Sequence, residues 1–172
     1  MSGLKQLRNR VKSIKSTQKI TKAMQVVSAA KLKKLKDKAE RLNDYSEVLG
    51  SIMYDIASSG NLMDLPESDR MFFSDELKSR PKLMIVLTSE RGLCGGFNSQ
   101  IVKRLKSDIE ELRAEGREFR LLIVGKKGYD ALKNSYADYI VGYFHIGREN
   151  SDCVGFQVRD RTIELIEKGE VG

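Results

Sequence analysis

Residues 4–35 read LKQLRNRVKSIKSTQKITKAMQVVSAAKLKKL, and this stretch predicts the first element of the fold. It contains no glycine, no proline and no acidic residue, and neither glycine nor proline occurs between Leu4 and Leu49. Apolar side chains recur at steps of three and four residues, the spacing that keeps one face of a helix against a partner. The pattern predicts one long helix from Ser2 to Ser58, roughly 85 Å long at about 1.5 Å per residue.

The expected helix carries two neighbouring stripes. Its apolar seam, of the coiled-coil type, consists of Leu4, Leu7, Val11, Ile14, Leu32, Leu35, Leu42 and Leu49. Between Ile14 and Leu32 the same grid is polar, so the seam is interrupted there. The basic stripe lies one residue beyond the seam, about 100° around the helix, and consists of Lys5, Arg8, Lys12, Lys15, Lys19 and Lys22. Such a shaft is expected to lie against an acidic and apolar partner.

The positive charge of the chain belongs to this helix. The net charge is +7, but residues 1–60 hold 13 basic and 5 acidic residues, whereas residues 61–172 hold 18 and 19. The basic, acid-free start also fits a mitochondrial transit peptide. We favour a mature helix, because the apolar grid continues past Asp37 and Lys greatly outnumbers Arg.

Cysteine and histidine usage limits the chemistry. Cys94, Cys153 and His145 are the only such residues, and their spacing matches neither a disulfide framework nor a zinc site. No apolar run is long enough to cross a membrane, and no secretory signal is visible. We therefore expect reduced thiols and no metal site.

The second half of the chain predicts a Rossmann-like α/β domain. Residues 60–81 hold both prolines and are expected to form a linker, with a short helical turn near Phe72–Leu77. Residues 82–172 then alternate strands with helices, which is typical of a parallel sheet with crossover helices. The expected strands are Lys82–Thr88, Phe119–Val124 and Tyr139–Phe144, and the expected helices are Ser99–Glu115, Lys126–Ser135 and Val158–Lys168. The apolar runs of the first two strands predict burial on both faces.

This α/β domain is expected to be incomplete. Three strands make a thin sheet, and the long helix of residues 1–59 has no partner of matching length in the sequence. We expect a second long helix and more sheet to belong with this chain. The isolated chain is then expected to be partly unfolded or to associate through its uncovered seam, and a cooperative, concentration-independent melt of a monomer would contradict this.

Two glycine-containing loops and one cysteine are candidate sites. Thr88–Asn98 (TSERGLCGGFN) follows a strand and precedes a helix, where phosphate loops occur, but it matches neither the P-loop nor the dinucleotide-binding pattern. A tight structural turn is the favoured interpretation. Gly125-Lys-Lys-Gly128 is interpreted as a basic helix start. Cys94 with His145 suggests a Cys-dependent enzyme only weakly, and a packed thiol is favoured.

The basic stripe leaves a second class of function open. A row of Lys and Arg suits the phosphates of a nucleic acid, as in a basic binding protein with a helical arm. The helix has no aromatic residue before Tyr45, however, so bases could not stack on it. A membrane-surface helix would favour Trp or Phe, which the seam lacks. A protein partner suits both stripes at once.

Three motifs together resemble the gamma subunits of the rotary ATP synthases. They are Leu4–Arg10 (LKQLRNR), Gln18–Met24 (QKITKAM) and Thr88–Asn98, in this order, and the resemblance spans the whole chain. It implies that the first helix pairs with a long C-terminal helix as an antiparallel coiled coil. This axle turns inside a ring of alpha and beta subunits, while the Rossmann-like domain lies at the foot, against the epsilon subunit and the membrane ring of c subunits. Members of the family continue well beyond Gly172, so the chain is expected to be the N-terminal portion.

The resemblance also implies roles for individual residues. It makes the chain a non-catalytic subunit that couples proton flow to ATP synthesis, without cofactor, nucleic acid or membrane insertion, because the catalytic sites lie on beta. The residues expected to contact the alpha and beta ring are Gln18, Lys19, Ile20, Thr21, Lys22 and Met24. Those expected to maintain the turn are Arg91, Gly92, Gly95, Gly96 and Asn98. With no extension before the helix, the expected location is the cytoplasmic face of the bacterial inner membrane, as a peripheral subunit.

Overall fold

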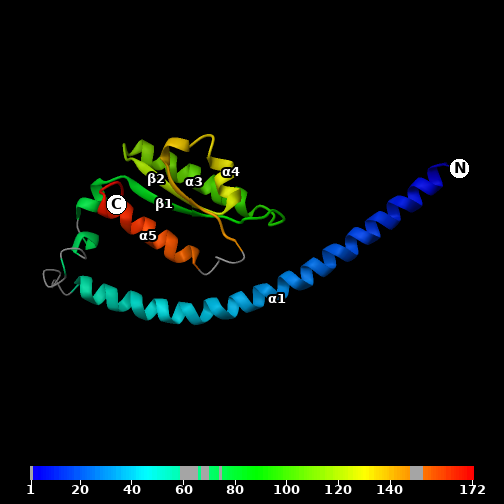
Figure 1. The fold of residues 1–172 in the computed structure, drawn as a ribbon, viewed down its shortest axis with the longest axis horizontal. Coiled ribbons are helices and arrows are strands. Elements are labelled where there is room, and N and C mark those ends of the chain that lie inside the picture. Colours follow the sequence, from blue (N-terminus) through cyan, green and yellow to red (C-terminus); the bar gives the residue numbers. More distant parts are fainter. Residues whose placement is uncertain (1, 59–65, 67–69, 74, 148–152) are drawn as a thin grey trace. The chain divides into compact units, whose positions relative to one another are not determined.

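The computed structural model describes residues 2–58, 66, 70–73, 75–147 and 153–172. The chain divides into two compact units, residues 1–64 and residues 65–172, and each is described by itself. Unit 1 is the helix α1 (Ser2–Ser58), which runs without a break for 57 residues and curves gently (Figure 1). The long helix predicted from the sequence is thus confirmed, with the predicted bounds.

Unit 2 is a parallel sheet with crossover helices, which confirms the predicted fold class. Its strands pair in the order β1-β2-β3, and both pairs are parallel. Lys82 lies opposite Phe119 at the start of the first pair, and Val124 lies opposite Phe144 at the end of the second. The elements are η2 (Met71–Phe73), η3 (Asp75–Ser79), β1 (Lys82–Leu87), α3 (Phe97–Ala114), β2 (Phe119–Val124), α4 (Lys126–Leu132), η4 (Ala137–Tyr139), β3 (Ile140–Phe144) and α5 (Val154–Glu167).

Helices cover the two faces of the sheet unequally. Helices α3 and α4 lie on one face and α5 lies on the other, as Figure 1 shows. The main core joins alternate residues of β1 and β2 to the inner sides of α3 and α4: Val86, Leu121, Ile123, Leu105, Ile109, Leu112 and Leu132. On the face of α5, Leu122 of β2 lies beside Gly142 and Arg161. The central strand β2 is therefore covered on both faces.

Hydrogen bonds of arginine side chains and of the C-terminal residue hold α5 and the residues after it against the sheet. The Arg161 guanidinium donates to the carbonyl of Val141 in β3 at 3.0 and 3.2 Å. Arg80, just before β1, donates to the carbonyl of Ile166 at 3.0 Å near the end of α5. The Gly172 N–H donates to the carbonyl of Pro81 at 3.0 Å. The last residues of the chain thus lie against the start of β1.

The prediction that β1 is buried on both faces is wrong. Ile85 is 44% exposed and Leu87 is 61% exposed, and only Val86 of this strand is buried. The reason is position, because β1 is an edge strand and α5 lies over β3 at the other edge of the sheet. Burial on both faces is correct for β2.

Several predicted boundaries are also corrected. The first strand ends at Leu87, and α3 begins at Phe97 and ends at Ala114. The helix α4 ends at Leu132, three residues early, and β3 begins at Ile140 because residues 137–139 form a 3-10 turn. The helix α5 begins at Val154 rather than at residue 158, because Val154 is buried and starts the packed face, while Gly155 is tolerated in the first turn. The predicted turn near Phe72–Leu77 is found as η2 and η3; most of residues 60–69 lie outside the described residues.

Candidate functional site: the surface of the long helix and the glycine-rich turn

The predicted seam is an exposed stripe along α1. Its eight apolar residues are 46–69% exposed, which is high for Leu, Ile and Val. Covering apolar side chains is worth roughly 1.5–3 kcal/mol for each full burial. The eight residues are partly covered by their own helix, so a partner would gain on the order of 10 kcal/mol from the seam. The seam therefore has the size and spacing of a helix-docking surface.

The basic stripe is exposed on the neighbouring side of α1. Arg8, Val11, Lys12, Lys15 and Lys19 line a shallow hollow of about 440 Å³ there. Within the described part of α1, the first ion pair along the helix is Lys36–Glu40, with 3.6 Å between Nζ and Oε1. The positive charge over residues 5–22 is thus not neutralised by neighbouring carboxylates of α1.

The Gln18–Met24 segment adds a third stripe that the sequence analysis did not single out. Ile20, Met24 and Val27 each lie one residue before a seam position and are 50–59% exposed. They occupy the flank opposite to the basic stripe, since one residue is about 100° of rotation. The signal was present in the sequence as apolar residues at i, i+4 and i+7.

The Thr21 side chain, in the polar interruption of the seam, forms hydrogen bonds within the helix. The Thr21 hydroxyl lies 3.1 Å from the carbonyl of Thr17 and 3.0 Å from that of Gln18, and the Thr17 hydroxyl donates to the carbonyl of Ser13 at 3.1 Å. Such back-bonding favours slight bending of a helix. All six residues expected to contact a partner lie on this exposed part of α1: Gln18, Lys19, Ile20, Thr21, Lys22 and Met24.

The glycine-rich turn is organised by Asn98. Its side-chain oxygen accepts the Ser89 N–H at 3.0 Å, and its amide nitrogen donates to the Ser89 hydroxyl at 2.8 Å and to the Cys94 sulfur at 3.1 Å. The turn places Leu93 in the left-handed region, with φ 66°, and leaves its side chain 94% exposed. The predicted turn residues therefore include one that fixes the loop through its side chain.

The other predicted turn residues differ in how far the backbone of the turn requires them. Gly95 has φ 57°, which favours glycine. Gly92 and Gly96 have no such conformation, and side chains there would meet either open space or the flexible Gln100. Arg91 is exposed, and its carbonyl accepts the Ser89 hydroxyl at 2.6 Å. Only Gly95 is thus required as glycine by its backbone angles.

The second glycine motif is closed by Thr88. A Cβ at Gly125, where φ is 101°, would lie 2.1 Å from the Thr88 carbonyl oxygen, and a Cβ at Gly128 would lie 2.7 Å from the Thr88 hydroxyl. That hydroxyl accepts the Gly128 N–H at 2.8 Å, and the Lys127 N–H donates to the Ser89 carbonyl at 3.1 Å. These glycines let β1 and α4 approach closely, and the N–H groups of Lys127 and Gly128 already have partners within the chain. Sequence reasoning placed Thr88 at the start of the Thr88–Asn98 motif but gave its side chain no role.

The two halves of the suggested Cys–His pair have other partners. The Cys94 thiol is half-buried and contacts Ser89 and Asn98. The imidazole Nδ1 of His145 lies 2.8 Å from Glu90 Oε2, and Glu90 Oε1 accepts the Ile146 N–H at 2.7 Å. Glu90 thus links the end of β1 to the residues after β3. These contacts position the loops that follow the carboxyl ends of β1 and β3.

The described residues also bear on metal sites and membrane-spanning helices. No group of three or more His, Cys, Asp and Glu side chains there could hold a metal ion. Of the helices in the described part of the chain, none combines the length and the apolar character needed to cross a bilayer.

Comparisons with known proteins agree with one another. A family model described as ATP synthase matches residues 3–171. The ATP synthase gamma chain of Rickettsia bellii (strain RML369-C) is 46% identical over 171 residues, and that of Rickettsia prowazekii (strain Madrid E) is 47% identical. Each alignment covers 99% of this chain and 59% of the relative, so the chain spans less than two thirds of these relatives.

One solved structure is similar at lower identity. It is a chain of the cryo-EM structure of the Euglena gracilis mitochondrial ATP synthase, rotor, rotational state 1. The identity is 21%, the TM-score is 0.33, and the match covers 64% of this chain and 44% of that chain.

Proposed function

The chain belongs to the family of ATP synthase gamma chains, and we propose that it acts as the central-stalk part of the rotor in a proton-driven ATP synthase. In this proposal α1 is one strand of the axle, its seam pairs with a second long helix, and the ring of alpha and beta subunits surrounds it. The epsilon subunit and the c-subunit ring bind at the foot. The assembly lies at the cytoplasmic face of a bacterial inner membrane, where this subunit is peripheral.

The observation that carries the proposal is the asymmetry of α1. Its exposed seam is flanked on one side by a basic stripe and, at residues 20–27, on the other side by an apolar stripe. A shaft with different chemistry on each side presents a different surface to each subunit around it. A ligand shifts a conformational equilibrium only by binding the states unequally. Rotation of an asymmetric shaft would therefore favour different conformations of the catalytic subunits in turn.

In this proposal the catalytic sites lie on the beta subunits, and this chain supplies contact surfaces. We propose that Gln18, Lys19, Ile20, Thr21, Lys22 and Met24 contact the alpha and beta ring. Lys19 and Lys22 belong to the basic stripe and are suited to acidic loops, while Ile20 and Met24 offer apolar contacts on the opposite flank. The glycine-rich turn is proposed to maintain the fold of the foot.

The test is assembly with the alpha and beta subunits, measured by native mass spectrometry at moderate salt. Lys19→Glu with Lys22→Glu should weaken recovery of the ring complex, because two charges facing acidic loops are reversed. The matched control is Lys31→Glu with Lys34→Glu, which makes the same charge change on the other flank of α1. Its recovery with the ring should be closer to that of the unaltered chain than the recovery of the Lys19 and Lys22 variant. Equal loss in both pairs, or recovery with nucleic acid in place of the subunits, would refute the proposed contact.

A further inference from the structure

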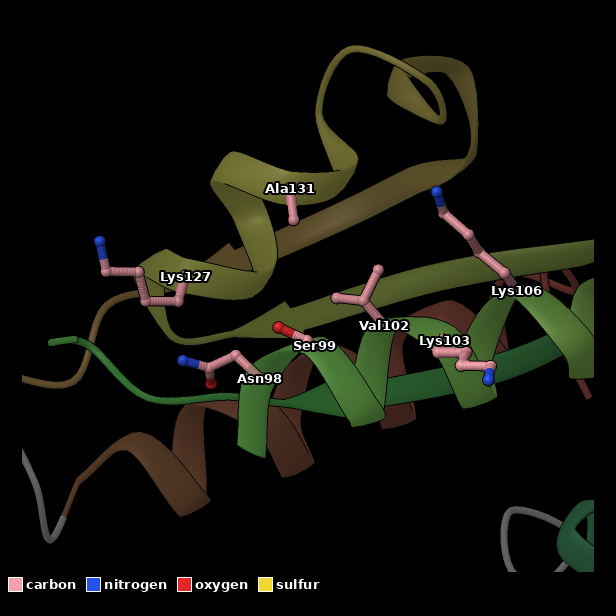
Figure 2. A pocket seen from close by; sticks show the side chains of 7 residues that line it. All are labelled: Asn98, Ser99, Val102, Lys103, Lys106, Lys127 and Ala131. Carbon is pink, nitrogen blue, oxygen red and sulfur yellow. The ribbon is translucent and has the colours of Figure 1, made fainter. Parts of the chain in front are cut away.

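A groove on unit 2 belongs to none of the surfaces described so far. It lies between α3 and α4 and has a volume of about 550 Å³. The residues that line it are Asn98, Ser99, Val102, Lys103 and Lys106 of α3 and Lys127 and Ala131 of α4. In Figure 2, Val102 and Ala131 lie in the middle of the groove, with Lys127 toward one end and Lys106 toward the other. The groove thus has a largely apolar centre, beside the Ser99 hydroxyl, between lysine side chains.

The charge of this groove is not compensated by its own lining. All the titratable side chains that line it are lysines, although residues 61–172 as a whole carry 18 basic and 19 acidic residues. Among the described residues, Lys103, Lys106 and Lys127 form no ion pair. Their neighbours do: Arg104 lies 2.8 Å from Asp108, and Lys133 lies 2.9 Å from Asp130. The positive charge is therefore concentrated where the surface is hollowed.

The backbone donors at the start of α4 offer little to a phosphate or nucleotide. Phosphate sites at a helix start use free backbone N–H groups. At the start of α4 the N–H groups of Lys127, Gly128 and Tyr129 donate to Ser89, Thr88 and Gly125, at 3.1, 2.8 and 3.3 Å. The Asn98 side chain is likewise engaged in the glycine-rich turn. What remains for a ligand is the Ser99 hydroxyl, flexible lysine charge and apolar surface.

We propose that this groove binds an acidic segment of a protein partner, with an apolar side chain on Val102 and Ala131 and carboxylates toward the lysines. Charge complementarity supports this occupant, because the groove offers cations at both ends of an apolar floor. A recessed groove between two helices suits a peptide segment better than it suits the flat surface of a lipid bilayer. The inference is independent of the role proposed for α1.

The test is a titration of the ¹⁵N-labelled full chain with a short peptide that alternates Glu and Leu, followed by NMR. The amide signals of Val102 and Ala131 should shift and saturate, and the same peptide with Gln in place of Glu should bind far more weakly. Lys103→Glu with Lys106→Glu should weaken binding by at least tenfold. Ala131→Glu, which places a carboxylate on the floor, should weaken it as well. Lys126→Glu is the matched control for Lys106→Glu alone, since Lys126 is exposed beside Lys127 but does not line the groove.

Localised signals separate this site from the basic α1, which will also attract an acidic peptide. Shifts confined to α1, or an equal loss with Lys126→Glu, would overturn the proposal. So would displacement of the peptide by inorganic phosphate at lower concentration, which would indicate a small-anion site. Vesicles of phosphatidylglycerol that shift Val102 and Ala131 when the peptide does not would assign the groove to lipid and overturn it too.

Discussion

Replacing Thr88 by Val should loosen the junction of β1, β2 and α4. Thr88 is 6% exposed, and its hydroxyl accepts the Gly128 N–H at 2.8 Å while lying 3.1 Å from the carbonyls of Val124 and Gly125. Valine keeps the branched shape but offers no acceptor. The buried Gly128 N–H then loses its partner, and a methyl group takes the place of the oxygen beside it.

The size of the effect follows from the lost acceptor. Leaving a buried donor unsatisfied costs about 1–3 kcal/mol. A central figure of about 2 kcal/mol is about a 30-fold change in an equilibrium constant. The matched control is Thr162→Val on α5, where the hydroxyl only donates to the Val158 carbonyl one turn back, at 2.8 Å. We expect that change to stay within about 0.5 kcal/mol, because no donor is left without a partner.

Hydrogen exchange with mass spectrometry measures the difference where it arises. In the Thr88→Val chain, peptides covering β2 and α4 should exchange about 30-fold faster than in the unaltered chain, as expected when local opening governs exchange. Peptides from α1 serve as an internal reference. Unchanged protection of β2 and α4, or an equal loss of protection in Thr162→Val, would refute the reasoning.

Two further substitutions and one titration test the loops and the last helix. Asn98→Ala should make residues 91–97 more sensitive to protease than Ser99→Ala does, because three hydrogen bonds of the turn are lost; equal cleavage would contradict it. Leu93→Gly should raise the free energy of unfolding by up to about 1 kcal/mol in a denaturant melt, since φ 66° is costly for leucine; a destabilised variant would show that the side chain packs. Hydrogen bonds from Lys168 and then Arg161 lower the pKa of Glu164 from 4.5 to about 2. Because the pKa is lowered in the folded chain, the ionised Glu164 contributes to stability above about pH 4.5, and this contribution is lost as the pH falls toward 2. A carboxyl titration of Glu164 by NMR with a midpoint near 4.5 would contradict this.

Features of this structure that are set by residues close together in the sequence could be predicted, and features set by distant contacts could not. The 57-residue helix follows from spacing and from the absence of breakers, both of which are local, and the parallel sheet follows from the order of strands and helices. The exposure of β1 could not be predicted, because Lys82–Leu87 has the same apolar run whether a helix covers it or not. Burial of one face depends on where α5 lies, and that is set by contacts such as Arg161 with the Val141 carbonyl.

The candidate sites divide in the same way. The seam and the basic stripe could be predicted from the sequence, because the spacing of residues in a helix determines the face on which each lies. The role of Thr88 could not, since it depends on Gly125 and Gly128, which lie 37 and 40 residues away. The lysine groove needs two helices to come together, and neither α3 nor α4 shows it alone. Features built from one element are predictable, whereas those shared between elements require the fold.

The geometry of α1 separates the proposed rotor from a nucleic-acid-binding arm. The basic stripe from Lys5 to Lys22 would extend about 26 Å along the helix, enough to follow the phosphates of a duplex. A duplex, however, offers nothing to the exposed seam on the adjacent face or to the Ile20, Met24 and Val27 stripe beyond it. A ring of proteins contacts a shaft from all sides and can cover all three stripes. If phosphate neutralisation were the main interaction, binding would fall steeply with salt; if apolar stripes dominate the assembly, it should persist at salt concentrations that strip nucleic acid from the chain.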